Sequence, residues 1–185
     1  VATTGGDNGS AGYQTAMRLM MFFLLPAWGL SNAAATLVGQ NLGANQVQRA
    51  EEAVLKTVKY NVIYMATVML ISLLGAELLV TFFTNDPEVQ VYAVKAVRVV
   101  ALGYIFYGIG MVLINAFNGA GDTWTPTWVN FIGFWLFQIP LAYFLAKYLK
   151  MGPMGVFVAI PVAETAITIA SFILFKRGKW KKVQV

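Results

Sequence analysis

Long uncharged, apolar stretches alternate along this chain with short groups of charged residues. A helix that crosses a membrane needs about 20 consecutive, mainly apolar residues. Strands of a membrane barrel would instead alternate polar and apolar side chains, and residues 62–71 do not alternate. The pattern therefore predicts an all-α membrane protein, a bundle of five spanning helices. Their expected bounds are residues 14–38, 58–83, 94–117, 125–147 and 154–175.

Turn signals lie between the predicted spans. Asn85-Asp86-Pro87 places a proline at the start of a helix, where its missing N–H costs nothing. The run 118–123 is rich in glycine, and its Asp122 or Thr123 is a suitable cap for the helix that follows. Good helix formers in the link 39–57 predict an interfacial helix that continues into the second span. Residues 1–12, rich in Gly, Ser, Asn and Asp, predict a loop that precedes the bundle of residues 13–182.

The composition supports a membrane protein and excludes several classes of site. Hydrophobic residues make up 58% of the chain and charged residues 11%, against about 25% charged in a soluble domain. Cysteine and histidine are absent, which excludes disulfides, thiolate or imidazole metal ligands, and serine–histidine or cysteine–histidine catalysis. We therefore expect neither an enzyme, nor a metal site, nor an organic cofactor.

The net charge of +5 is concentrated in a basic tail, residues 176–185. A basic cluster directly after an apolar span is typical of a cytoplasmic flank that faces anionic lipid, so we expect membrane lipid and not nucleic acid as its partner. Counting Lys and Arg on the two sides of five spans gives eight on the side of the C-terminus and five on the other, which favours a cytoplasmic C-terminus.

The sequence begins at Val1 without an initiator methionine, and we expect it to be a piece of a longer protein.

Glu164 is an ionisable residue near the middle of the last predicted span. A charge at the bilayer centre costs about 2.5–3.5 kcal/mol on the insertion scale, so such residues usually face the bundle interior and mark function. Small and polar side chains at helical spacing share its face: Pro161, Thr165, Thr168 and Ser171. Two interpretations remain open. Glu164 is a proton- or cation-binding carboxyl that couples transport to an ion, or it is a packing acid that hydrogen-bonds a neighbouring helix.

Polar side chains also form stripes on the third and fourth predicted spans. The third carries Tyr104, Tyr107, Gly108, Met111, Asn115 and Asn118, and the fourth carries Thr127, Asn130, Phe134 and Gln138. Amide, methionine and aromatic groups on one face suit a cavity for flat, lipophilic organic cations. We expect Tyr107, Met111, Asn130 and Gln138 to line it. The alternative is polar contact between tightly packed helices, which we favour for Asn115 and Asn118.

Three motifs resemble the multidrug and toxic compound extrusion (MATE) family, in the same order and spacing. Residues 31–44 (SNAAATLVGQNLGA), with Ala50 and Ala53, are similar to the second helix of a lobe in that family. Residues 117–123 (FNGAGDT) with Pro126 resemble its turn between the fourth and fifth helices. Residues 139–143 (IPLAY), then Gly152, Gly155-Val156 and Ala159-Ile160, resemble its fifth and sixth helices.

The resemblance implies a bacterial inner-membrane antiporter with twelve helices in two lobes, which exports organic cations in exchange for Na⁺ or H⁺ by alternating access. The basic ending, residues 175–180, suggests the C-terminal lobe, so this chain would supply five of six helices and require the N-terminal lobe as partner. An acid often found in the first helix of this lobe is missing. Tyr107 occupies the position of another, in the fourth helix, so coupling would rest on the N-terminal lobe or on Glu164.

Two rival functions remain open at this point. A flippase for lipid-linked oligosaccharides, from the same superfamily, would need a strongly cationic cavity for pyrophosphate, and Arg18 is the only basic residue expected inside a span. A membrane scaffold without transport activity would bury its polar stripes fully against neighbouring helices.

Overall fold

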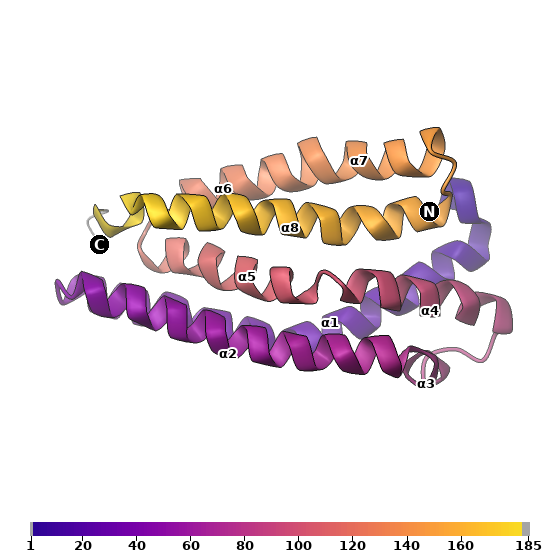
Figure 1. Cartoon of the computed structure of the whole chain (residues 1–185), viewed down its shortest axis with the longest axis horizontal. Helices are drawn as coiled ribbons and strands as arrows, with labels where there is room; N and C mark the ends of the chain where they lie inside the picture. The colour runs from indigo at the N-terminus through magenta and orange to yellow at the C-terminus, as the bar shows by residue number, and fades with distance from the viewer. Residues whose placement is uncertain (1, 183–185) are drawn as a thin grey trace.

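The computed structural model describes the backbone of residues 2–182 and the side chains of residues 6–181. The described chain is helical almost throughout (Figure 1). Its elements are α1 (Ala2–Gly43), α2 (Val47–Leu74), α3 (Ala76–Thr81), α4 (Pro87–Ala101), α5 (Tyr104–Gly119), α6 (Trp124–Asn130), the π-helix η1 (Phe131–Gln138), α7 (Ile139–Tyr143), the π-helix η2 (Phe144–Tyr148), α8 (Pro153–Arg177) and the 3₁₀ turn η3 (Lys179–Lys182).

The predicted membrane bundle is confirmed. Four stretches are long and apolar enough to cross a membrane, namely Gly6–Gly43, Val47–Leu74, Trp124–Tyr148 and Pro153–Arg177. The helices α4 and α5 qualify together as a fifth, although they meet at an angle of 55°. The third predicted span, residues 94–117, is therefore broken near its first third, at Leu102 and Gly103.

The loop predicted for residues 1–12 is wrong over its described part. Residues 2–12 belong to α1, with one non-helical position at Gly6, where φ is 61°; Val1 lies outside the described residues. Tertiary contact explains the difference. Gly12 packs so closely on α4 that an added Cβ would lie 2.6 Å from the Tyr92 Cβ, and the Asn8 amide donates a hydrogen bond to Glu88.

The second predicted span also begins and ends differently. Helix α2 starts at Val47, which agrees with the expected interfacial extension, and it stops at Leu74. Gly75 separates it from the short α3, so residues 76–81 form a separate turn of helix instead of the end of a span. A glycine favours such a stop because it has the largest backbone freedom to lose in a helix.

The predicted helix caps are present. Asp86 accepts hydrogen bonds from the backbone N–H groups of Glu88 and Val89, and Pro87 occupies the first position of α4. Asp122, rather than Thr123, serves α6, because its Oδ1 accepts from the Thr125 N–H at 3.0 Å.

Helices α1, α2, α5 and α8 contribute to a continuous interior. One cluster near the C-terminal end of α8 joins Val38, Val54, Phe117, Phe175 and Trp180. A second cluster joins α1, α2 and α5 with Ile160 of α8 and the end of α4. The segment Trp124–Tyr148 lies at the edge of the bundle and packs mainly on α8, beside which it runs in the opposite direction (Figure 1).

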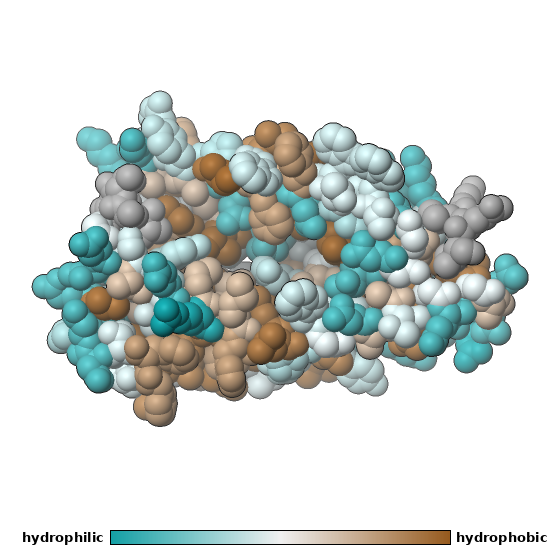
Figure 2. All heavy atoms as spheres, turned by 180° about the vertical axis from the view of Figure 1, so that it is seen from behind, coloured by the Kyte–Doolittle hydropathy of each residue, from teal (hydrophilic) through white to brown (hydrophobic). Residues whose placement is uncertain are grey.

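The surface has the distribution expected of a protein in a bilayer. Figure 2 shows hydrophilic residues gathered toward the two ends of the long axis, with apolar and weakly polar residues over much of the surface between them. This face is also hollowed near its middle, where a few hydrophilic residues lie. Together with the apolar helices, this pattern describes a multi-pass membrane protein.

Candidate functional site

Helices α5 and α8 approach each other closely where α4 and α5 meet. Gly103 lies against Pro161, and an added Cβ at Gly103 would be 2.7 Å from the Pro161 Cβ. One and two turns further along, the Thr168 hydroxyl donates to the Phe106 carbonyl at 2.6 Å and lies against Gly110. The absence of side chains at the two glycines allows this close packing of the two helices.

Glu164 lies in this seam between α5 and α8. Its side chain is buried, with 7% exposure, and it lies one turn of α8 away from both Pro161 and Thr168. Tyr107 is on the facing helix α5, next to Phe106, whose carbonyl accepts the hydrogen bond from Thr168. Among the described residues, none donates a hydrogen bond to the Glu164 carboxyl or forms an ion pair with it. The carboxyl therefore lacks the protein partner that a packing acid would be expected to have.

The polar stripe expected around Glu164 faces the bundle interior. Thr168 and Ser171 are buried, and Pro161 and Thr165 are half-buried. The Thr165 hydroxyl donates to the Pro161 carbonyl at 2.7 Å, within α8 itself. The Ser171 hydroxyl is buried without a hydrogen-bond partner among the described residues. The stripe therefore contains a polar group that can still form a hydrogen bond.

The four residues expected to line a cavity fall into two groups. Tyr107 and Met111 are half-buried on α5, against the cluster that includes Met65. Asn130 and Gln138 are half-buried at the end of α6 and of η1, and the Gln138 Oε1 atom is buried without a partner among the described residues. The main pockets among the described residues are not lined by either group. Their role as cavity lining stays a prediction.

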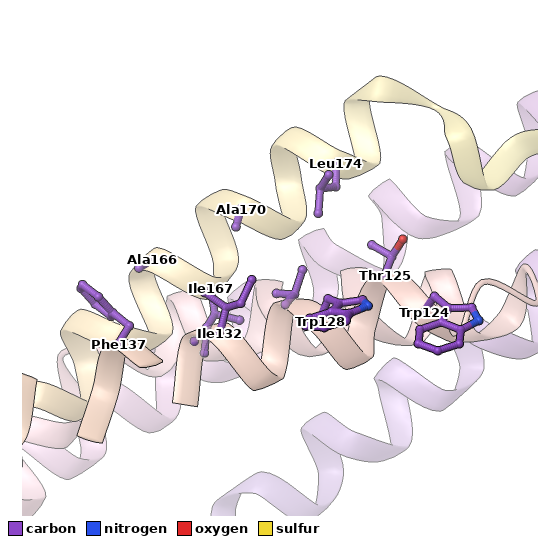
Figure 3. Close-up of a pocket in the computed structure, with 11 residues that line it drawn as sticks. Trp124, Thr125, Trp128, Ile132, Phe137, Ala166, Ile167, Ala170 and Leu174 are labelled. Carbon is purple, nitrogen blue, oxygen red and sulfur yellow. The ribbon is translucent and has the colours of Figure 1, made fainter. Parts of the chain in front are cut away.

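An apolar groove lies elsewhere in the bundle. A groove of about 580 Å³ runs between α6–η1 and α8, and its walls include Trp128, Ile132 and Ala170 (Figure 3). None of the four expected cavity residues lines it.

Polar contact between helices is found for one of the two asparagines expected to provide it. The Asn115 amide donates to the Ser31 hydroxyl of α1 at 3.0 Å and to the Met111 carbonyl at 3.2 Å. Asn118 is exposed, and no described residue forms a hydrogen bond with its side chain.

The sequence analysis missed Asn61, which is fully buried in α2. Its amide donates to the Gly108 carbonyl of α5 at 2.9 Å, and its Oδ1 has no partner among the described residues. An amide inside an uncharged span was the available signal. Its partner is a backbone carbonyl 47 residues away, which no spacing in the sequence reveals.

Comparison with known proteins gives consistent matches. The model of the MatE family matches residues 1–144. The chain is 26% identical over 177 residues to "Probable multidrug resistance protein NorM" of Thermotoga maritima and 26% identical over 186 residues to "Multidrug resistance protein MdtK" of Photorhabdus laumondii, with 96% and 97% of this chain covered. It is also 27% identical over 167 residues, 90% of this chain, to a Shewanella oneidensis protein named "FAD transporter".

The chain spans 36–39% of the length of these relatives. Among solved structures, an inward-facing multidrug resistance MATE family transporter of the MOP superfamily matches 100% of this chain and 43% of its own, with a TM-score of 0.88 and 23% identity. A MOP superfamily transporter from Pyrococcus furiosus matches with a TM-score of 0.91, 98% and 41% coverage, and 23% identity. At this identity the structural matches establish the fold.

Proposed function

Because the chain belongs to the MatE family, we propose that it forms the C-terminal lobe of a bacterial antiporter that exports organic cations and drugs. The relatives named for multidrug resistance support a drug or cation transporter. The coverage of only 36–39% of the relatives' length supports a second lobe as partner. In this proposal the lobes rock about a central cavity, and Na⁺ or H⁺ binding opposes drug binding.

The buried carboxyl of Glu164 is the observation that carries the coupling proposal. It lies beside the bend between α4 and α5 and has no polar partner among the described residues. A change in its charge alters the free energy of keeping the Glu164 side chain buried. Because Glu164 lies where α8 contacts the bend, this change affects that contact directly. Glu164 therefore takes up and releases the coupling cation or proton, and the packing of α8 against the bend between α4 and α5 changes in response.

The hollowed face supports the position of the substrate cavity. It lies in the middle third of the bundle, away from the hydrophilic ends (Figure 2). Tyr107, Met111, Asn130 and Gln138 contribute one wall of the cavity, and the second lobe contributes the other. Arg18 is exposed in α1, and a single arginine does not provide the cationic cavity that a pyrophosphate-carrying flippase would need.

The substitution Glu164→Gln tests the coupling proposal in the full-length transporter. Glutamine keeps the size of the side chain and fixes it in a neutral state. We expect dye efflux from inverted vesicles to fall about tenfold, equivalent to about 1.4 kcal/mol, and to lose its dependence on pH while the protein level in the membrane stays the same.

Glu77→Gln is the matched control, because Glu77 is an exposed glutamate that pairs with Arg98 at 3.1 Å. We expect its efflux and pH profile to equal those of the wild type. If Glu164→Gln also leaves both unchanged, Glu164 is a packing residue.

Repeating the assay with a Na⁺ gradient in place of a pH gradient identifies the coupling ion. Adding FAD as substrate tests the activity for which one relative is named.

A further inference from the structure

The apolar groove between α6–η1 and α8 is open to the outside of the bundle (Figure 3). Its volume of about 580 Å³ is within the range of small-molecule sites in proteins. Trp124 and Trp128, on its rim, are 72% and 54% exposed. None of the described residues that line it is acidic or basic. The lining residues are Trp124, Thr125, Trp128, Val129, Ile132, Gly133, Phe137, Ala166, Ile167, Ala170 and Leu174.

Small residues explain why the groove is there. Gly133 lies directly against the Ile167 side chain, so η1 and α8 touch at that level. From this contact α6 and α8 diverge toward the end of α8 (Figure 3). Ala166 and Ala170 leave the α8 wall shallow along the diverging part. The result is an elongated apolar slot that points from the middle of the bundle toward one of its ends.

The end of the slot is basic. Ala166, Ala170 and Leu174 follow at intervals of four, and Arg177 lies three residues further on the same face of α8. Lys176 is next to it, and both are exposed. Two acids that serve this end of the bundle are already engaged: the two oxygens of Asp122, before α6, accept hydrogen bonds from the Thr125 N–H and hydroxyl, and Glu51 pairs with Lys181. The charge at this end is therefore net positive.

The rim indoles have unused hydrogen-bond donors. Among the described residues, none accepts a hydrogen bond from the indole N–H of Trp124 or Trp128, whereas the buried Trp180 donates to the Phe175 carbonyl at 3.0 Å. Indole groups with one apolar and one wet side are enriched at the level of lipid headgroups. Their position beside the basic end of the slot places that end at the headgroup level.

We propose that this groove binds an anionic phospholipid, with one acyl chain in the slot and the phosphate at Arg177 and Lys176. The slot has the apolar walls and the opening to the bilayer that an acyl chain needs. Its basic end complements a phosphate and repels an organic cation, so it is distinct from a site for the exported substrate. Anionic lipid is abundant in the cytoplasmic leaflet, where a basic flank is expected to lie.

Lipid retention by the full-length protein tests the proposal. Purified protein is incubated with phosphatidylglycerol or with phosphatidylcholine of the same acyl chains, and bound lipid is counted by native mass spectrometry. Ala170→Trp fills the slot, and Ile169→Trp adds a larger side chain at the next position, which is 53% exposed and outside the groove. We expect phosphatidylglycerol retention to fall at least fivefold in the first variant and to stay unchanged in the second.

The charge component has its own pair of variants. Arg177→Gln is expected to abolish the preference for phosphatidylglycerol over phosphatidylcholine, while Lys150→Gln, at the opposite end of the bundle, leaves that preference intact. Equal retention in the two tryptophan variants would overturn the proposal, and it would also be the result if another part of the protein covered the groove. Loss of retention in Ala170→Trp without any headgroup preference would overturn the assignment of the phosphate site.

Tryptophan fluorescence provides a measurement that does not depend on a bulky substitution. Phospholipids brominated along the acyl chain quench indoles that they contact. Trp128→Phe should remove a larger share of the quenchable signal than Trp28→Phe, although Trp28 and Trp128 are both 54% exposed. Equal losses would show that the groove is no better a lipid site than the rest of the surface, and the proposal would fail.

Discussion

Gly103 and Pro161 show how two residues set the geometry of the site. Gly103 brings no side chain to the contact, and Pro161 has no N–H to donate to the carbonyl one turn earlier in α8. The first allows the close approach of the bend to α8, and the second loosens α8 at the same level. Tyr107 and Glu164 follow one turn further along α5 and α8. Glu164, the candidate coupling residue, therefore lies one turn from the bend at Gly103 and one turn from the missing hydrogen bond at Pro161.

Replacing Gly103 by alanine should destabilise the protein. The new Cβ would lie 2.7 Å from the Pro161 Cβ and 2.8 Å from its Cα, and neither atom is at the end of a flexible side chain. We expect a loss of about 1–3 kcal/mol, the usual cost of an overpacked contact, visible as a lower temperature of unfolding in detergent.

Gly29→Ala is the control, since a Cβ at Gly29 meets no atom within 4 Å. In a helix this change is expected to be neutral or to stabilise by up to about 1 kcal/mol. A Gly103→Ala protein as stable as Gly29→Ala would show that the bend and α8 can move apart freely.

Single residues were predictable from the sequence where their own chemistry restricts them. Glu164 was expected to be buried because a carboxyl in the middle of an apolar span is costly in contact with lipid and therefore faces the interior of the bundle. Asn61 and Gly103 were missed, because their importance depends on the partners Gly108 and Pro161, which lie 47 and 58 positions away.

At the scale of elements, the end of α8 is fixed by several contacts. Gly178 adopts a left-handed conformation with φ of 69°, and its N–H bonds the Phe175 carbonyl at 3.1 Å. The chain then turns back, so that Trp180 stacks on the Phe175 ring at 4.9 Å and is fully buried. Lys181 adds an ion pair with Glu51 of α2 at 2.5 Å. This end of the basic tail thus fastens α8 to α2.

Trp180→Ala should weaken this attachment strongly. Truncating a fully buried tryptophan costs about 3–5 kcal/mol, because it removes buried surface and leaves a cavity. We expect a marked drop in the temperature of unfolding, with Trp180→Phe in between. Trp135→Ala is the control, as that side chain is 65% exposed. Similar unfolding temperatures for the two alanine variants would contradict the burial of Trp180.

The length of the uncharged, apolar stretches predicted the spans well. Elements that depend on tertiary contact were predicted less well. Residues 2–12 have the composition of a loop, yet they are helical because α4 packs against them at Gly12. Trp180 belongs to the basic tail that was expected to face lipid, and the left-handed turn at Gly178 instead directs its side chain into the core. Asp86 and Asp122 were predictable as caps, since capping depends on neighbours within three residues.

At the scale of the whole molecule, the two ends of the bundle differ in charge. The turn between α1 and α2 lies at the same end as the C-terminus (Figure 1). The turn between α3 and α4 lies at the opposite end. The excess of Lys and Arg on the C-terminal side favours a cytoplasmic position for that end. The orientation in the membrane remains a prediction from this asymmetry.

Single cysteines can test the orientation directly, because these 185 residues contain none of their own. We expect a maleimide that does not cross the membrane to label Asn85→Cys in intact cells. Gln48→Cys and Lys179→Cys should react only after the cells are permeabilised. Positions 48, 85 and 179 are all exposed, so unequal labelling reports the side of the membrane. The reverse pattern would place the C-terminus outside.

The burial of Trp180 has a consequence for the order of events during synthesis. The cluster that Trp180 completes includes Val38 of α1, which leaves the ribosome 142 residues earlier (180 − 38). At about 5–20 residues per second, about 7–28 seconds pass between the two. During that interval helices α2 to α8 are synthesised, while the cluster at this end of the bundle still lacks Trp180. The docking of one indole is therefore among the last steps in the assembly of these helices.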